Sequence, residues 1–199
     1  MTTKFSQKVV DWLIANRTVK AEDREIYLYG LQQGIIMILN IITTIIIGFC
    51  LGMVWQSIVF MVAYIPLRSF AGGYHARTQL KCYILSIVLT VVVLIMIKFI
   101  PATDIYIIVL TGIASGIIAR LSPMGDSNKP LDELEVKVYG KRARIILAIE
   151  ICVIVISLLF KLYIMALTIA ISLVALSVML ILGGLARSKR RFTQEHLRS

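Results

Sequence analysis

The chain has 199 residues, 59% of them apolar, with a mean hydropathy of +0.89 and a formal charge of +10. Long apolar runs fill most of it, so we expect a membrane protein and not a water-surrounded core. Three scattered cysteines and two histidines argue against a disulfide framework or a metal cluster. We therefore expect no metal or cofactor, and no nucleic-acid partner.

The N-terminal segment, residues 1–30, is polar and charged at its start and lacks the apolar core and cleavage site of a signal peptide. Apolar residues at helical spacing, interspersed with charges, predict an amphipathic helix in the membrane interface, apolar side down. They are Phe5, Val9, Val10, Trp12, Leu13 and Ile14. A loosely ordered basic tail is the alternative.

Three apolar blocks follow, at residues 31–67, 82–119 and 145–186. Each is about twice the ~20 residues that one helix needs to cross a ~30 Å hydrocarbon layer, so each predicts a helical hairpin. Turn signals divide them at residues 48–52, residues 101–104 and Lys161. The prediction is an all-α polytopic membrane domain over residues 31–186, with six transmembrane helices as three hairpins. Gly112 and Gly116 have the GxxxG spacing of a close helix contact, which also arises by chance.

The basic residues are concentrated outside the apolar blocks. Of the 21 Lys and Arg residues, 19 lie in the N-terminal segment, in the linkers 68–82 and 120–144, and in the basic tail 187–199. Only Lys98 and Lys161 lie elsewhere. Because cytosolic loops carry the excess of Lys and Arg, both termini are predicted to be cytosolic in the cell membrane.

The first linker reads RSFAGGYHARTQLKC and holds a histidine and a cysteine, His75 and Cys82. A cytosolic cysteine stays reduced, and its thiolate is a nucleophile that His75 could generate. The cations Arg77 and Lys81 would favour the thiolate. Thr78 is an expected helix N-cap, which would put Cys82 in the first turn, where the helix dipole also favours an anion.

Geometry restricts this hypothesis. On one straight helix His75 and Cys82 would lie ~10 Å apart, so the segment must bend. Gly72 and Gly73 allow a bend, and could also admit a substrate backbone or supply amide donors to an oxyanion. On spacing alone, one histidine and one cysteine near a membrane are more often incidental than catalytic.

Other residues of interest lie within the apolar blocks. Cys50 and Cys152 are interpreted as packing residues. Glu150 is costly inside a membrane unless it is paired or faces a wet cavity. It could pair with Arg144, act as a structural anchor or help to bind substrate, and the structural role is favoured slightly.

The linker motif closely resembles the hallmark of the AgrB family, which is Arg, then Gly-Gly-Tyr-His-Ala, then a cysteine seven residues after the histidine. The later linker SPMGDSNKPLDELEVKVYGKRARI is similar to the family's Asn-Lys-Pro loop. The family comprises membrane cysteine endopeptidases of Gram-positive quorum sensing. The resemblance covers essentially the whole chain and strongly favours the catalytic interpretation.

The resemblance implies a reaction and a partner. Cys82 would attack the bond before the acidic C-terminal segment of an AgrD-like propeptide, with His75 as base and then acid. A cysteine or serine within the signal would then attack the thioester, which closes a thiolactone or lactone ring. Arg68 and the segment from Lys129 to Arg144 are expected to contact the acidic tail, although topology and anionic lipids would also account for these charges.

Two rival functions stay open. One is a small transporter that exports a signal peptide without proteolysis, and the other is a non-catalytic adaptor for a sensor kinase. A homodimer is compatible with so compact a membrane body. The sequence does not identify the precursor or a third catalytic residue.

Overall fold

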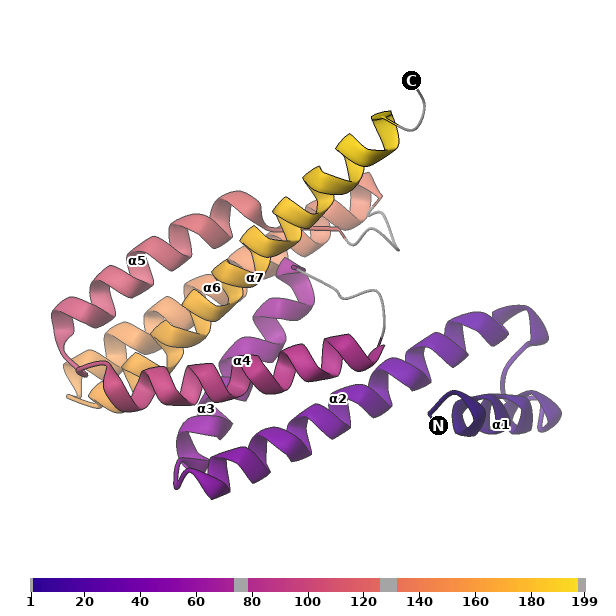
Figure 1. The fold of residues 1–199 in the computed structure, drawn as a ribbon, viewed down its shortest axis with the longest axis horizontal. Helices are drawn as coiled ribbons and strands as arrows, with labels where there is room; N and C mark the ends of the chain where they lie inside the picture. The colour runs from indigo at the N-terminus through magenta and orange to yellow at the C-terminus, as the bar shows by residue number, and fades with distance from the viewer. Residues whose placement is uncertain (1, 74–78, 126–131, 197–199) are drawn as a thin grey trace.

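The computed structural model describes residues 2–73, 79–125 and 132–196, and every regular element in this part of the chain is helical (Figure 1). A short N-terminal helix and a single 3-10 turn precede six long helices. In chain order the elements are α1 (Thr2–Ala15), η1 (Ala21–Asp23), α2 (Arg24–Cys50), α3 (Val54–Ala71), α4 (Gln79–Phe99), α5 (Asp104–Leu121), α6 (Glu133–Leu159) and α7 (Tyr163–His196).

The long helices break where the sequence predicts. Within the three apolar blocks, short connections at residues 51–53, 100–103 and 160–162 separate α2 from α3, α4 from α5 and α6 from α7. In Figure 1 these three connections lie toward the left, whereas the two chain termini lie toward the right. Successive long helices therefore run in alternating directions, and the two ends of the chain lie on the same side.

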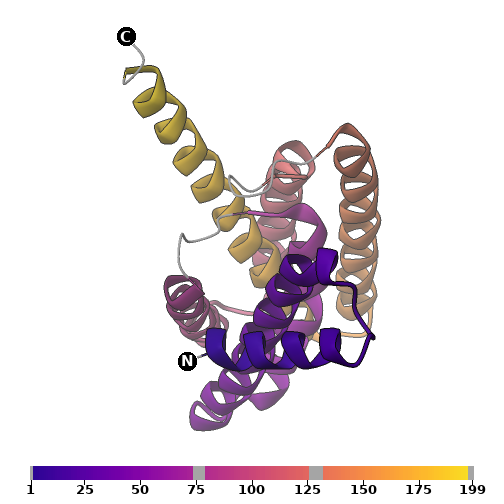
Figure 2. The same cartoon turned by 90° about the vertical axis from the view of Figure 1, so that its right-hand side faces the viewer.

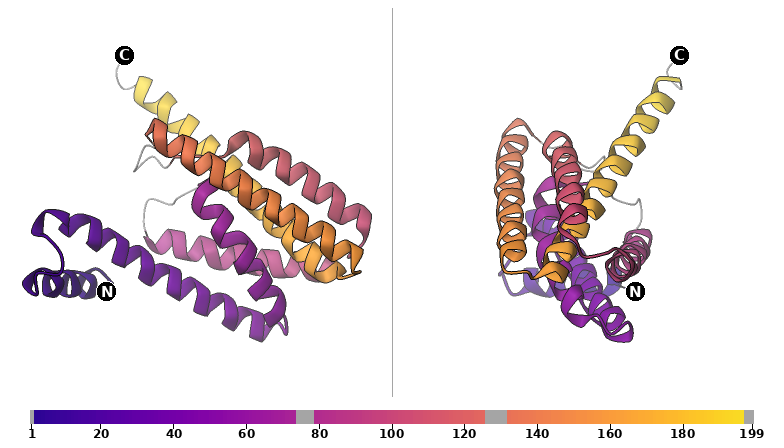
Figure 3. Two further views of the ribbon diagram at one scale, coloured as in Figure 1. Left: turned by 180° about the vertical axis from the view of Figure 1, so that it is seen from behind. Right: turned by 90° about the vertical axis from the view of Figure 1, so that its left-hand side faces the viewer.

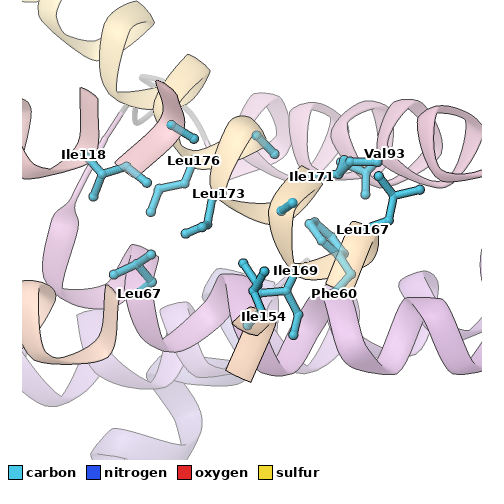
Figure 4. Packing of buried hydrophobic residues seen from close by; sticks show 14 of the residues in the cluster. Phe60, Leu67, Val93, Ile118, Ile154, Leu167, Ile169, Ile171, Leu173 and Leu176 are labelled. Atoms are coloured by element: carbon cyan, nitrogen blue, oxygen red, sulfur yellow. The ribbon is translucent and has the colours of Figure 1, made fainter. Parts of the chain in front are cut away.

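The core is built around α7. Within Tyr163–Ser188 this helix is apolar on all sides, and 72% of its most apolar stretch is buried inside the molecule. This is expected for a helix surrounded by others. It packs against α3, α4, α5 and α6. Figure 4 shows side chains of these helices meeting those of α7. The labelled α7 residues are Leu167, Ile169, Ile171, Leu173 and Leu176, and their labelled neighbours are Phe60, Leu67, Val93, Ile118 and Ile154.

The middle apolar block is not a packed hairpin. After the turn at residues 100–103, α4 lies along α2 and α7, whereas α5 packs mainly on α7, and the two make almost no contact with each other. The buried residues of α5 explain this, because Ile107, Thr111, Ala114 and Ile118 form one stripe that faces the core. Gly112 and Gly116 lie off this stripe with open space around them, so the close helix contact predicted from their spacing is absent from the described structure.

Five helical segments are long and apolar enough to cross a membrane. They are Ala21–Cys50, Val54–Ala71, Leu80–Phe99, Asp104–Leu121 and Tyr163–Ser188. The remaining long helix, α6, has 27 residues, but Arg142, Arg144 and Glu150 interrupt its apolar stretch. The chain has the features of a membrane protein, while α6, the fifth predicted span, lacks the composition of the other five.

The helices at both ends of the predicted membrane domain extend beyond its apolar blocks. The first long helix, α2, begins at Arg24 and not near residue 31, so the end of the N-terminal segment is part of it. At the other end, α7 continues to His196 and carries the start of the basic tail as helix. Figure 2 shows this last part of α7 projecting away from the other helices.

The N-terminal helix α1 is amphipathic in a different way from the prediction. Val10 is 1% exposed, and α1 packs on the beginning of α2. Phe5 and Trp12 are 62% and 64% exposed. The apolar residues thus divide between a face that contacts α2 and a face that does not. An ion pair of 2.9 Å between Arg24 and Asp11 joins the two helices.

Candidate functional site

Two of the predicted site residues, His75 and Lys129, lie outside the described residues, as do Arg77 and Thr78. The pairing of His75 with Cys82 therefore stays a prediction. Five predicted residues can be placed: Arg68, Gly72, Gly73, Cys82 and Glu150. Four of them lie at or near the end of α3 and the start of α4, and the fifth lies well along α6.

Cys82 is in the first turn of α4, as predicted, because this helix begins at Gln79. Its side chain is a free thiol of intermediate exposure. The backbone amides of a helix's first turn have no acceptor within the helix and carry partial positive charge. The next residue, Tyr83, shares a hydrogen bond of 2.6 Å with the Thr43 hydroxyl, which ties this turn to α2.

Arg68 lies in the last turn of α3, one helical turn after Tyr64. Its guanidinium carbon is 5.9 Å from the centre of the Tyr64 ring, and the guanidinium also hydrogen-bonds to the Tyr64 hydroxyl. That hydroxyl is within electrostatic range of the Cys82 side chain. The ring stacks on Phe60 at 5.2 Å. Tyr64 therefore positions the Arg68 guanidinium at the end of α3, the helix that contacts α4.

Gly72 and Gly73 follow the last residue of α3, and Gly72 contacts Met124 in the α5–α6 connection. Their φ angles are +77° and +133°, a conformation that residues with a side chain rarely adopt. A β-carbon on Gly72 would overlap the carbonyl oxygen of Met124, and one on Gly73 would lie 2.7 Å from Arg68 Nη1. The close approach that Gly72 permits is thus to the chain itself, between α3 and the α5–α6 connection.

Glu150 lies on the inner side of α6. It is 7% exposed, and within the described residues neither carboxylate oxygen has a hydrogen-bond partner. It belongs to a buried stripe spaced three or four residues apart, which consists of Gly140, Ala143, Leu147, Glu150, Ile154 and Ser157. Of the alternatives left open for Glu150, the pair with Arg144 is not formed among the described residues, because Arg144 is exposed and lies outside this stripe.

The two remaining cysteines do not pack in the core. Cys50 and Cys152 are both exposed, so the interpretation of them as packing residues is wrong. Cys50 ends α2 beside a turn, and Cys152 lies on α6 between two members of the buried stripe. Among the described side chains, no three His, Cys, Asp or Glu residues come together as metal ligands would.

Tyr64 is the site residue that the sequence analysis missed. Its sequence signal is the spacing of four residues before Arg68, which places the two side chains on one face of a helix. That spacing is common in helices, and only the position of α4 beside α3 gives it a connection with Cys82.

Comparison with known proteins gives a consistent result. The family model described as "AgrB: Accessory gene regulator B" matches residues 6–181. "Putative AgrB-like protein 1" of Clostridium perfringens strain 13 is 25% identical over 64% of this chain and 68% of its own length. "Putative AgrB-like protein" of strain SM101 is 26% identical over 66% of this chain and 64% of its own.

A relative from another genus matches a longer stretch. "Protein FsrB" of Enterococcus faecalis strain OG1RF is 24% identical over 76% of this chain and 64% of its own length. The chain thus covers about two thirds of the length of these relatives, and slightly less for two of the three. No solved structure matches the chain.

Proposed function

Because the chain belongs to the AgrB family of the agr quorum-sensing system, we propose that it is a membrane cysteine endopeptidase and cyclase with Cys82 as its nucleophile. Its substrate would be a short AgrD-like propeptide with an acidic C-terminal segment. The observation that carries the proposal is the position of Cys82 in the first turn of α4, a helix in contact with α3, whose last turn carries Arg68.

The proposed reaction has two acyl transfers. In the first, His75 takes the Cys82 proton and the thiolate attacks the carbonyl before the acidic segment. The peptide C–N bond breaks, His75 returns the proton to the leaving amine, and a thioester joins the signal to Cys82. In the second, a cysteine or serine of the signal gives its proton to His75 and attacks the thioester, so that the ring closes and Cys82 leaves as thiolate.

Local charge supports the first transfer. The helix dipole of α4 stabilises the thiolate before attack and after release. Arg68 would supply a positive charge on the neighbouring helix, where its guanidinium lies over the Tyr64 ring. Preorganised charge of this kind stabilises developing negative charge without reorganisation during the reaction.

The proposal includes a membrane arrangement. All six long helices would span the cell membrane with both termini in the cytosol, in agreement with 19 of the 21 Lys and Arg residues being on that side. A cytosolic surface this basic would attract the acidic segment of the propeptide along the membrane. A homodimer is included as a further proposal.

The test is cleavage of an AgrD-like propeptide by the purified full-length protein in liposomes, with mass spectrometry to detect the released tail. Cys82→Ala and His75→Ala are expected to abolish release. Cys50→Ala and Cys152→Ala serve as matched controls, because both side chains are exposed thiols away from the α3–α4 junction. Tail release by Cys82→Ala would overturn the mechanism, and transport of a finished peptide without cleavage would favour an exporter instead.

A further inference from the structure

A cationic hollow of about 520 Å³ lies on α6, bordered on one side by Pro123 of the α5–α6 connection. Three exposed cations line it, Lys137, Lys141 and Arg144. They follow one another at intervals of four and three residues, which places them on one face of the helix over roughly 10 Å of its length. The hollow is therefore a row of positive charges that runs along the helix axis.

The hollow owes its shape to a small residue. A β-carbon added to Gly140 would lie 3.2 Å from Pro123 Cδ, which is closer than an ordinary van der Waals contact. Glycine at this position lets Pro123 approach α6 while the longer cationic side chains extend around it. Pro123 precedes Met124, which is hydrogen-bonded to the end of α3, so this wall of the hollow is held in place.

The positive charge of the hollow is uncompensated within its lining. No acidic residue belongs to the set of described side chains that line it. Three cations on one helix face repel one another and create a positive potential that an anionic ligand would neutralise. A phosphate group accepts hydrogen bonds from several cations at once, which suits this arrangement.

The inner end of the same hollow is apolar. Ile145 and Ala148 line it there, and the exposed surface of α6 continues with Ile149 and Ile156, which are 56% and 53% exposed. Seen from behind in Figure 3, α6 lies in front of α7 and no other helix covers its outer side. The surface therefore changes from cationic to apolar along the direction in which α6 leads away from the basic linker.

We propose that this hollow binds one anionic phospholipid of the cytosolic leaflet. Its phosphate would lie among Lys137, Lys141 and Arg144, and its acyl chains would cover Ile145, Ala148 and the apolar surface beyond. Basic pockets at the cytosolic ends of membrane helices suit such headgroups. From the sequence, these cations were expected to contact the acidic tail of the propeptide, with anionic lipids and topology as the alternative explanation of their charge. A lipid suits the hollow better because an acidic peptide segment offers no apolar chain for its inner end.

The lipid site is independent of the peptidase proposal and remains if that proposal fails. The test uses purified full-length protein in mild detergent and native mass spectrometry to count retained lipids. Dioleoylphosphatidylglycerol is offered in competition with dioleoylphosphatidylcholine. The wild type is expected to retain the anionic lipid on the order of tenfold more than the zwitterionic lipid, since each nearby cation strengthens the attraction to an anionic lipid severalfold.

Variants locate the effect. The triple variant Lys137→Gln, Lys141→Gln, Arg144→Gln should lose the preference for the anionic lipid. The triple variant Lys137→Arg, Lys141→Arg, Arg144→Lys keeps the three charges and should retain the preference. The matched control Lys20→Gln, Arg120→Gln, Arg187→Gln removes the same number of exposed cations outside the hollow and should retain it too. Lys141→Gln alone, with circular dichroism to confirm folding, replaces the triple variant if that variant does not fold.

Two further ligands distinguish the sources of negative charge. Inorganic phosphate at the same concentration is expected not to displace the lipid, and neither is a short peptide of Asp and Glu. Displacement by phosphate alone would make the hollow a free-phosphate site, and displacement by the peptide would assign it to an acidic protein segment. Either result, or equal retention of the two lipids by the wild type, would overturn the proposal.

Discussion

Gly72 and Met124 are in direct backbone contact, although 52 positions separate them in the chain. The Met124 amide donates a hydrogen bond of 2.9 Å to the carbonyl oxygen of Ala71, and the space where Gly72 would carry a β-carbon is filled by the Met124 backbone. This contact joins the linker before Cys82 to the linker that leads into α6. The described ends of the two predicted functional linkers are therefore in direct contact.

Replacing Gly72 by alanine should break this connection. The positive φ angle of +77° and the overlap with Met124 together disfavour any side chain, at a cost of about 1–3 kcal/mol. We expect the apparent melting temperature in detergent to fall by roughly 5 °C, and propeptide cleavage to fall further, because the linker that holds His75 would shift.

Gly112→Ala is the matched control for this prediction. Gly112 lies inside α5 with open space around it, so the same substitution should be neutral or stabilise the helix by up to about 1 kcal/mol. Equal losses of stability in the two variants would show that the contact with Met124 has no special weight.

The class of fold and the positions of the helix breaks were predictable, because both depend on local features. Apolar runs of known length and the turns near residues 51–53 and 160–162 are visible in the sequence. The faces on which helices pack were not predictable, because a helix that is apolar all round has no periodicity to indicate its buried side. For this reason the outward position of Cys152 and the separation of α4 from α5 were missed.

The candidate site was predictable to a similar extent. Cys82 in a first turn follows from local sequence, since the linker must end where the next apolar run begins. The proximity of Tyr64 to Cys82 depends on how α3 and α4 lie relative to each other, and the contact of Gly72 with Met124 depends on the α5–α6 connection. Neither arrangement leaves a pattern in one linker.

Tyr64→Phe tests the link between Arg68 and the nucleophile. The variant removes the hydroxyl that bonds to the guanidinium but keeps the ring stacked on Phe60. We expect the rate of propeptide cleavage to fall roughly tenfold, as for loss of one hydrogen bond to a charged group, with little change in melting temperature. The change in kcat/KM would be measured from the initial rates of cleavage at subsaturating propeptide concentrations.

Tyr106→Phe is the control, because Tyr106 is an exposed residue near the start of α5, at the opposite end of the helices. It should cleave at the wild-type rate. Undiminished cleavage by Tyr64→Phe would show that the hydroxyl does not contribute to the site.

Glu150→Met should stabilise the protein. Burying a carboxylate without hydrogen-bond partners is unfavourable, and methionine has a similar length without the charge. Each kcal/mol gained would raise the melting temperature by about 2–4 °C. Glu22→Gln, at an exposed position, should leave it unchanged. A lower melting temperature for Glu150→Met would show that the buried carboxylate does not destabilise the protein. Loss of cleavage in a stabilised variant would indicate that Glu150 helps to bind the substrate.

The two ends of α5 provide a direct test of membrane orientation. Thr103 precedes this helix and Arg120 lies in its last turn, and both are exposed. Eighteen residues of helix separate the ends by about 27 Å, close to the thickness of the hydrocarbon layer. In a variant without the three native cysteines, we expect a membrane-impermeant maleimide to label Thr103→Cys on intact cells. Arg120→Cys should be labelled only after permeabilisation, because the cationic end of each helix is retained in the cytosol. The opposite labelling pattern would place Cys82 outside the cell, where a reduced thiol and a cytosolic propeptide would not meet.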